Sequence, residues 1–287
     1  MKEISFYNGE FLAYDEALTK VEDRGNTFGD GVYDALSCFN NKPFNLDMHV
    51  DRFFNSMDEV KINSPYTKRN IKDIIKQGLE ITSLDKAFVY FQITRGTSRR
   101  SHAYPDEIIG NFYLVIREKP SYEKYRRNGA SIISMLDDRW QRCDIKSLNL
   151  LPNVIAAKKA SEVGCIEALL IRNGYAAECT ASSIFLVKDR VIYTEPLSKH
   201  ILNGVTRTCL MDIAPKANID IIERHSSVDD YYKADEVFIT SCSKLMLNIT
   251  KIDDKAISDN HPISDKLYTA YINNVKEQCG EIDKNKI

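Results

Sequence analysis

The alternation of helix-like and strand-like segments is the feature that most limits how this chain can fold. Residues 46–60 and 67–81 each repeat apolar side chains at helical spacing, which predicts two amphipathic helices. Residues 86–94 and 110–118 are short runs rich in β-branched and aromatic side chains, which is typical of strands. Because helices and strands that alternate in this way pack as layers, we predict a mixed α/β (α+β) fold.

The second half of the chain contains a strong hairpin signal. Residues 166–178 read as a strand, an Asn173-Gly174 turn and a second strand. The segment 120–129 is polar, begins with a proline and ends with a glycine, which favours a linker. We therefore predict a small N-terminal α/β domain over 1–119, the linker 120–129, and a larger C-terminal domain over 130–287.

Composition excludes several classes of partner. The chain has 287 residues and a formal net charge of −2, which favours neither nucleic acid nor an acidic membrane surface. No apolar run approaches the roughly 20 residues of a membrane span, and the N-terminus has no secretory apolar region. The seven cysteines form no CxxC pair, and the five histidines show no metal-ligand spacing. We expect a cytoplasmic protein with reduced thiols and no metal.

A loop between two predicted strands gathers positive charge. It carries Arg95, Arg99, Arg100 and His102 within a few residues. The guanidinium fork of arginine matches a carboxylate, so the loop could bind an anion. A solvated loop with ordinary surface charges is the alternative, and the residues alone leave the two open.

The stretch "DRGNTFGDGVYD", residues 23–34, is rich in glycine without matching a phosphate-loop motif. It lacks GxxxxGK, and Asp34 takes the place of the third glycine of GxGxxG. A tight turn is the simpler interpretation, with Tyr33 as the reactive side chain of interest. A predicted helix start near Val205 and Thr206 could bind phosphate through its N–H groups, although capping uses the same residue types.

Three more residues have an ordinary and a functional interpretation. Lys146 lies between a segment with Trp140 and an apolar run, where partial desolvation would favour the neutral, nucleophilic amine. Most lysines are nevertheless surface lysines. Glu178 follows the hairpin strand and could simply face solvent, and Arg52 could be a surface charge beside the apolar stripe of 46–60.

The order and spacing of several motifs carry a resemblance across nearly the whole chain. They are "DRGNTFGDGVYD", "HVDRF", "YFQITRGTSRRSHAYPD", "DDRWQRCDIKSLNLL", "GCIEALLIRNG", "ILNGVTR" and "DEVFITS". Together they resemble the class IV aminotransferases of fold type IV, which use pyridoxal 5′-phosphate (PLP), and among them the D-amino acid transaminases.

The resemblance implies a role for each candidate toward PLP. Lys146 would form the Schiff base and then carry the proton between the substrate and the cofactor. Glu178 would face the pyridine nitrogen, and Leu202 would pack on the ring face. The implied phosphate ligands are Arg52, Val205, Thr206, Ser241 and Cys242.

The resemblance also implies the substrate and the assembly. Tyr33, Arg100 and His102 match a trap for the substrate carboxylate, and the Arg-x-His pair is associated with D-amino acids. The family's loop crosses to the partner subunit, so a homodimer is expected. The implied ping-pong reaction converts D-alanine and 2-oxoglutarate, a 2-oxo acid, to pyruvate and D-glutamate. Alternatives are a branched-chain L-aminotransferase, an aminodeoxychorismate lyase and a PLP-binding protein without activity.

Four positions depart from the family pattern. Ser183 replaces a common asparagine, and Cys179 stands where glycine is common. Cys242 replaces a threonine, so its backbone N–H is the donor that remains toward phosphate. Arg99 adds a cation where proline is familiar, which would favour dicarboxylate substrates such as glutamate.

Overall fold

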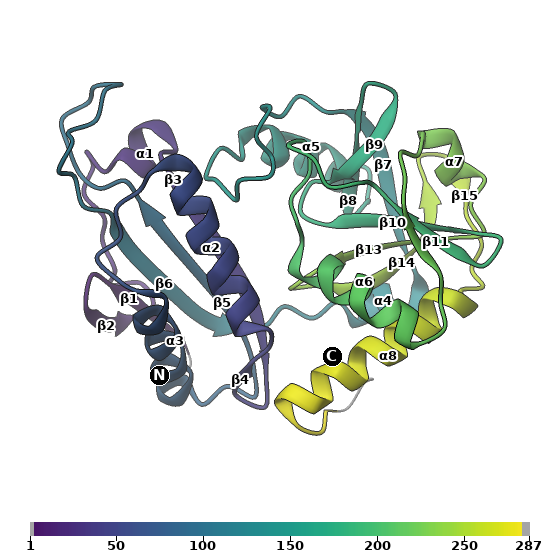
Figure 1. The fold of residues 1–287 in the computed structure, drawn as a ribbon, viewed down its shortest axis with the longest axis horizontal. Coiled ribbons are helices and arrows are strands. Elements are labelled where there is room, and N and C mark those ends of the chain that lie inside the picture. Colours follow the sequence, from purple (N-terminus) through teal and green to yellow (C-terminus); the bar gives the residue numbers. More distant parts are fainter. Residues whose placement is uncertain (1–2, 283–287) are drawn as a thin grey trace. The chain divides into compact units, whose positions relative to one another are not determined.

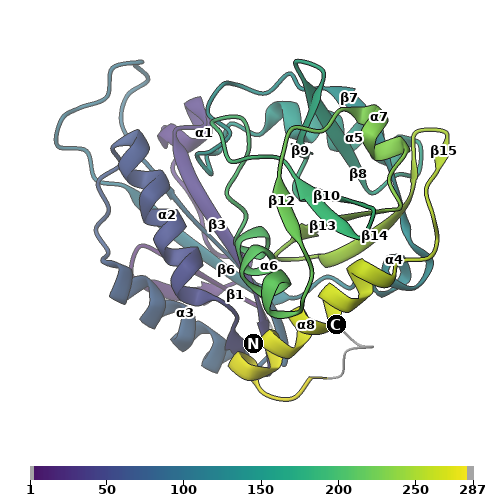
Figure 2. The same cartoon turned by 45° about the vertical axis from the view of Figure 1, so that its right-hand side comes forward.

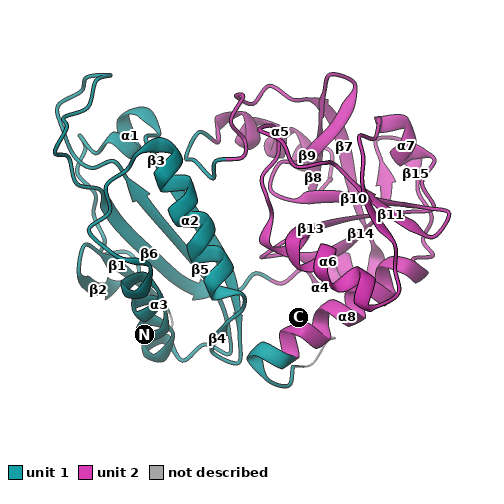
Figure 3. Ribbon diagram, in the orientation of Figure 1, with its two compact units in different colours: residues 1–120, 145–149, 277–282 teal, residues 121–144, 150–276, 283–287 magenta. Residues whose placement is uncertain are grey.

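The computed structural model describes residues 3–282, which fall into two compact units (Figure 3). Of the described residues, the first unit contains 3–120, and the second contains 121–144 and 150–276. Two short segments, 145–149 and 277–282, belong to the first unit although the boundaries predicted from the sequence place them in the second. The segment that carries Lys146 is thus part of the N-terminal unit.

The first unit is built on a six-stranded antiparallel sheet in the order β2-β1-β6-β5-β3-β4. Its strands are β1 (Ile4–Tyr7), β2 (Glu10–Ala13), β3 (Gly31–Phe39), β4 (Lys42–Pro43), β5 (Lys86–Thr94) and β6 (Asn111–Glu118). The long pairing of β3 with β5 and of β5 with β6 forms its centre. The strands predicted over 86–94 and 110–118 are confirmed.

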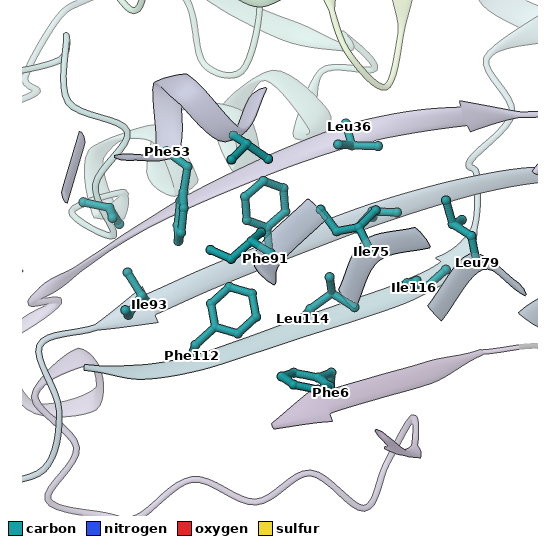
Figure 4. Close-up of a cluster of buried hydrophobic side chains, with 14 of the residues drawn as sticks. Phe6, Leu36, Phe53, Ile75, Leu79, Phe91, Ile93, Phe112, Leu114 and Ile116 are labelled. Carbon is teal, nitrogen blue, oxygen red and sulfur yellow. The ribbon is translucent and has the colours of Figure 1, made fainter. Parts of the chain in front are cut away.

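Helices α2 (Leu46–Val60) and α3 (Lys68–Thr82) run along one side of this sheet (Figure 1). Each presents one apolar stripe, and the two stripes meet the inward side chains of β5 and β6 in one core. Figure 4 shows Phe53 of α2 and Ile75 of α3 directed toward Phe91 and Leu114 of the strands. Both predicted helices are confirmed, because their apolar spacing is what this layer requires.

The second unit contains a nine-stranded mixed sheet (Figure 2). Its path is β12-β11-β10-β13-β14-β7-β8-β9, with β15 paired to β14. The strands are β7 (Ala130–Leu136), β8 (Glu167–Arg172), β9 (Tyr175–Cys179), β10 (Ser183–Lys188), β11 (Val191–Thr194), β12 (Ile221–Glu223), β13 (Glu236–Ser241), β14 (Leu245–Ile252) and β15 (Lys255–Ala256). The predicted hairpin is confirmed, since Asn173 and Gly174 both adopt positive φ between β8 and β9.

The remaining helices are α1 (Arg24–Phe28), α4 (Glu123–Asn128), α5 (Leu151–Glu162), α6 (Val205–Lys216), α7 (Val228–Tyr232) and α8 (Pro262–Cys279). The segment predicted as a linker, 120–129, contains α4, whose Arg126 donates a hydrogen bond to the Lys244 carbonyl at 3.0 Å. Within residues 3–282, no helix combines the length and the apolar character needed to cross a membrane.

Candidate active site

Hydrogen bonds to β3 and α2 fix the backbone around Lys146 within the first unit. The Tyr33 N–H donates to the Lys146 carbonyl at 2.9 Å, and the Leu148 N–H donates to the Gly31 carbonyl at 3.0 Å. The Lys146 N–H in turn donates to Ser56 Oγ at 3.2 Å. At Gly31 an added Cβ would lie 2.7 Å from the Leu148 side chain, so the close approach requires glycine.

The Lys146 amine lies against an aromatic and polar surface of the same unit. Its Nζ is 4.4 Å from the centroid of the Tyr33 ring, which stacks on Tyr90 with centroids 5.4 Å apart. The hydroxyls of Tyr90 and Tyr113 donate to Gln92 Oε1 at 2.6 and 2.7 Å. Burial raises the pKa of both Tyr90 and Tyr113, which keeps them protonated donors. Two residues predicted for separate roles, Lys146 and Tyr33, are therefore neighbours.

Arg52 is held by a buried carboxylate and is no solvated surface charge. Its Nε donates to Asp34 Oδ2 at 2.8 Å and its Nη2 donates to Asp34 Oδ1 at 2.9 Å, which makes a bidentate, fork-like ion pair. His49 Nδ1 lies 2.8 Å from the same Oδ1. The three groups come from β3 and from one face of α2, where residues 49 and 52 are neighbours at i and i+3. The fork fixes the plane of the guanidinium.

The charge state of this cluster follows from its partners. Burial raises the pKa of Asp34, but Arg52 and His49 lower it by a larger amount, so the pKa ends well below its usual range. Burial also lowers the pKa of His49, and the nearby cations Arg52 and Lys146 add to this effect although Asp34 opposes it. Asp34 is thus an anion and His49 a neutral ring that orients it.

The structure divides the candidate cluster of cations on the loop after β5. Arg95 is buried at 6% exposure, binds Asp30 through Nε, and donates to backbone carbonyls through both Nη atoms. It is therefore a structural residue and does not face an external anion. Arg99, Arg100 and His102 are exposed. The Arg100 guanidinium lies 5.0 Å and the His102 ring 5.4 Å from the centroid of Phe28, which brings these two predicted residues together.

Glu178 occupies a polar setting inside the second unit. Its side chain on β9 is ion-paired with Arg139 and is buried at 8% exposure, so the solvent-facing alternative is wrong. The Leu202 N–H donates to Glu178 Oε2 at 3.1 Å, which joins the residues predicted for the ring nitrogen and the ring face. Arg139 is itself held by Asp137, through Nε at 2.9 Å and Nη2 at 2.9 Å. Glu178 thus has a cationic side-chain partner and a backbone donor within the second unit.

The first turn of α6 offers backbone donors in the same unit. Its N-cap is Gly204, which provides no side-chain cap for the N–H groups of the first turn. An added Cβ at Gly204 would lie 2.9 Å from Ser183 Oγ, so a capping side chain would have to displace that hydroxyl. Val205 and Thr206 begin the helix, and a side-chain hydrogen bond joins Thr206 to Tyr271. A helix start of this kind suits a phosphate group.

Ser241 and Cys242 lie at the turn from β13 to β14. Ser241 Oγ accepts a hydrogen bond from the Lys244 N–H at 3.2 Å. The Lys244 side chain enters the interior and binds Glu167, with Nζ 2.9 Å from Oε1. Burial lowers the pKa of Lys244, but Glu167 raises it beyond its usual value. The same Glu167 accepts from Ser182 Oγ at 2.8 Å, so one buried ion pair joins this turn to the loop that follows Glu178.

Several charged or titratable residues of these networks had no role in the sequence-based prediction, among them Asp34, His49, Arg139, Glu167 and Lys244. Weak signals existed for the first four, because each stands in one of the motifs that carry the resemblance. No sequence pattern distinguished Lys244, which is 77 positions from Glu167 and meets it only in the folded chain.

Comparison with known proteins identifies the family. The family model described as Amino-transferase class IV matches residues 31–252. The chain belongs to the class IV aminotransferase family. It is 35% identical over 281 residues to the D-alanine aminotransferase of Listeria monocytogenes serotype 1/2a (strain 10403S), covering 96% of this chain and 97% of the relative. It is 36% identical over 279 residues to the D-alanine aminotransferase of Bacillus licheniformis, covering 96% and 98%.

Solved structures of branched-chain aminotransferases share the fold. The branched-chain amino acid aminotransferase from Escherichia coli superposes with a TM-score of 0.88 at 19% identity, covering 99% of this chain and 97% of that one. The branched-chain aminotransferase from the archaeon Thermoproteus uzoniensis, solved with norvaline, superposes with a TM-score of 0.87 at 20% identity, covering 96% of each chain. The resemblance to this family and the mixed α/β fold of type IV are both confirmed.

Proposed function

We propose that this aminotransferase is a PLP-dependent D-amino acid transaminase that converts D-alanine and 2-oxoglutarate to pyruvate and D-glutamate. The placement of Lys146 carries the proposal. Its backbone is fixed by β3 and α2, and its amine lies 4.4 Å from the ring centroid of Tyr33, the residue expected at the substrate. The names of the relatives at 35–36% identity support the choice of D-alanine.

The residues present fit the cofactor by their chemistry. Glu178 is a buried carboxylate suited to a protonated pyridine nitrogen, and Leu202 adjoins it through its N–H at 3.1 Å. The uncapped first turn of α6 at Val205 and Thr206, with Ser241, Cys242 and Arg52, supplies donors suited to a phosphate. When bound, PLP would act as an electron sink for charge that develops at the substrate α-carbon.

Lys146 would bind the cofactor covalently and then move a proton to and from the substrate α-carbon as general base and general acid. A primary amine can do both, whereas an arginine stays protonated. Asp34 and His49 would keep the Arg52 fork oriented toward the phosphate. Tyr33, Arg100 and His102 would bind the substrate carboxylate.

A homodimer with two-fold symmetry is part of the proposal. The Arg100 and His102 loop is exposed in the single chain, as expected of a loop that serves a partner's site. Size determination in solution tests the assembly. Mixing Lys146→Ala chains with Arg100→Ala chains tests the sharing, since shared sites would restore some activity in the mixed dimer.

A half-reaction separates the proposed function from its rivals. The protein is loaded with PLP, and loss of the visible band of Lys146-bound cofactor is followed after D-alanine, L-alanine or L-leucine is added. We expect conversion by D-alanine alone. Conversion by L-leucine alone would instead support a branched-chain L-aminotransferase. Release of pyruvate from aminodeoxychorismate without any 2-oxo acid acceptor would support the lyase.

A Lys146→Ala variant provides the matched control. It should lose the visible band and the half-reaction while Glu178 and the phosphate donors still bind the cofactor. Equilibrium dialysis with PLP measures that residual binding. If wild-type protein binds no PLP in the same experiment, the proposed function is wrong.

A further inference from the structure

A buried arginine outside the predicted site holds the loop that carries Arg100 and His102. Arg24, in α1, is 3% exposed. Its Nη1 donates to the Ser101 carbonyl at 2.7 Å and its Nη2 donates to the His102 carbonyl at 3.3 Å. Its Nε donates to Asp30 Oδ2 at 2.8 Å. The guanidinium therefore binds the backbone of two successive loop residues and one carboxylate.

The loop depends on this contact for its shape. Within the described chain, residues 99–104 take part in no backbone–backbone hydrogen bond. Their carbonyls at 101 and 102 instead accept from Arg24, which lies under the loop. Because a buried cation is costly unless it is paired and hydrogen-bonded, these partners are strongly preferred over alternatives. One side chain thus selects one conformation of an otherwise irregular segment.

A shared ring directs the two loop side chains. Phe28, at the end of α1, lies 4.7 Å from the Arg24 guanidinium and 5.0 Å from the Arg100 guanidinium, measured to the ring centroid. The His102 ring lies 5.4 Å from the same ring. The backbone contacts of Arg24 and the side-chain contacts of Phe28 therefore place Arg100 and His102 side by side.

A second cation ties this arrangement to the core of the unit. Asp30 also accepts from Arg95 Nε at 2.8 Å, and Arg95 donates to the carbonyls of Val60 and Lys61 at the end of α2, both at 2.8 Å. Its guanidinium lies 3.8 Å from the ring centroid of Tyr104, on the far side of the loop. The loop is therefore contacted by two arginines, Arg24 at its backbone and Arg95 at the Tyr104 ring, and both arginines bind the Asp30 carboxylate.

We propose that Arg24 is a positioning residue for substrate recognition, which sets how strongly the enzyme prefers an amino acid over an amine without a carboxylate. The inference rests on the proposed function, in which Arg100 and His102 bind the substrate carboxylate. Arg24 touches neither substrate nor cofactor. It acts through the backbone at 101 and 102, so its loss should disturb carboxylate binding and leave the chemistry at Lys146 intact.

Two substrates test this role on the PLP-loaded full-length enzyme. D-alanine carries the carboxylate, and ethylamine is the same skeleton without it. Half-reaction rates with each are compared in wild type, Arg24→Met and Arg24→Lys. In Arg24→Met we expect the preference for D-alanine to fall by about tenfold or more, the effect of one charge-assisted hydrogen bond. The ethylamine rate and the bound PLP should stay near the wild-type level.

Arg24→Lys should lose less of the preference, because it keeps the charge although it lacks the planar fork. The matched control is Arg69→Met, an arginine of α3 that is 91% exposed and far from the loop in sequence. It should change neither rate. Limited digestion with trypsin after the exposed Arg99 and Arg100 should be faster in Arg24→Met than in the control, since the loop loses its contact.

A double variant separates positioning from an independent effect. Because Arg24 acts through Arg100 and His102, adding Arg24→Met to Arg100→Ala should reduce the preference by less than Arg24→Met does alone. The inference is overturned if Arg24→Met slows D-alanine and ethylamine equally, or if the two substitutions add fully. If Arg24→Met does not fold, the same comparison of rates in Arg24→Lys decides.

The half-reaction of the wild-type enzyme tests the proposed function and not the role of Arg24. Failure of wild type to convert D-alanine contradicts the proposed function, and the amino acid that it does convert then replaces D-alanine in the comparison. An unchanged preference in the Arg24 variants with that substrate overturns the positioning role. A reduced preference supports it, whichever enantiomer the enzyme accepts.

Discussion

Asp34→Asn tests whether the buried fork beneath Arg52 is needed for both stability and cofactor binding. The substitution keeps the shape of the side chain and removes its charge. Asp34 is fully buried and Arg52 is 14% exposed, so asparagine leaves a nearly buried cation without its anion. Breaking such a pair costs about 3–5 kcal/mol. Because the guanidinium retains some contact with solvent, we expect a loss of about 3 kcal/mol, at the lower end of that range.

Urea unfolding of the variant without PLP measures this cost, and PLP titration measures the effect on affinity. The matched control is Asp51→Asn on the helix that carries Arg52, because Asp51 pairs with Lys68 at 2.7 Å with side chains that are 54% and 46% exposed. An exposed pair contributes about 0–1 kcal/mol. Equal losses in the two variants would refute the buried-fork reasoning. A large loss of stability with unchanged PLP affinity would refute the role assigned to Arg52.

Three further predictions concern other buried groups. Lys244→Met should lower the free energy of unfolding in urea by about 3 kcal/mol, because it leaves Glu167 buried at 1% exposure without its cation. Adding Glu167→Gln to this variant should recover part of that loss, because it removes the unpaired charge. Burial raises the pKa of the Cys179 thiol, so iodoacetamide should modify the partly exposed Cys165 before Cys179 in native protein. When the protein is labelled in urea instead, mass spectrometry should show no such order between the two cysteines. Burial lowers the pKa of His49, so the unfolded chain takes up a proton before the folded chain as the pH falls from about 7 to about 5. Stability in urea should decline over that range, and His49→Gln should flatten the decline.

Local periodicity was sufficient for much of the fold. The apolar stripe of 46–60 and the Asn173-Gly174 turn predicted α2 and the β8–β9 hairpin, because both depend on interactions between residues close in the chain. Helix α4 was missed because it contains no buried residue and so has no apolar stripe to reveal it. The grouping of 145–149 with the first unit was missed for a different reason. Its hydrogen bonds join Lys146 and Leu148 to residues more than ninety positions away.

The candidate site shows a similar division. Motif order proposed Arg52 and Glu178 through resemblance, but the motifs that contain Asp34 and Arg139 did not indicate that these residues hold them. Physical chemistry nevertheless requires such residues, because a charged group is seldom buried without a partner of opposite charge. The structure supplies Asp34 for Arg52 and Arg139 for Glu178.

The same requirement applies to the loop of Arg100. Its exposed side chains could be proposed from sequence, whereas the buried cation beneath them could not, since Arg24 lies 77 positions from the carbonyl it binds. Under the proposed function, we therefore expect specificity to depend on two layers of residues. Groups proposed to meet ligands carry recognisable motifs, and the charges that orient those groups become apparent once their buried partners are known. A variant in the second layer should alter selectivity while every proposed ligand-binding residue remains in place.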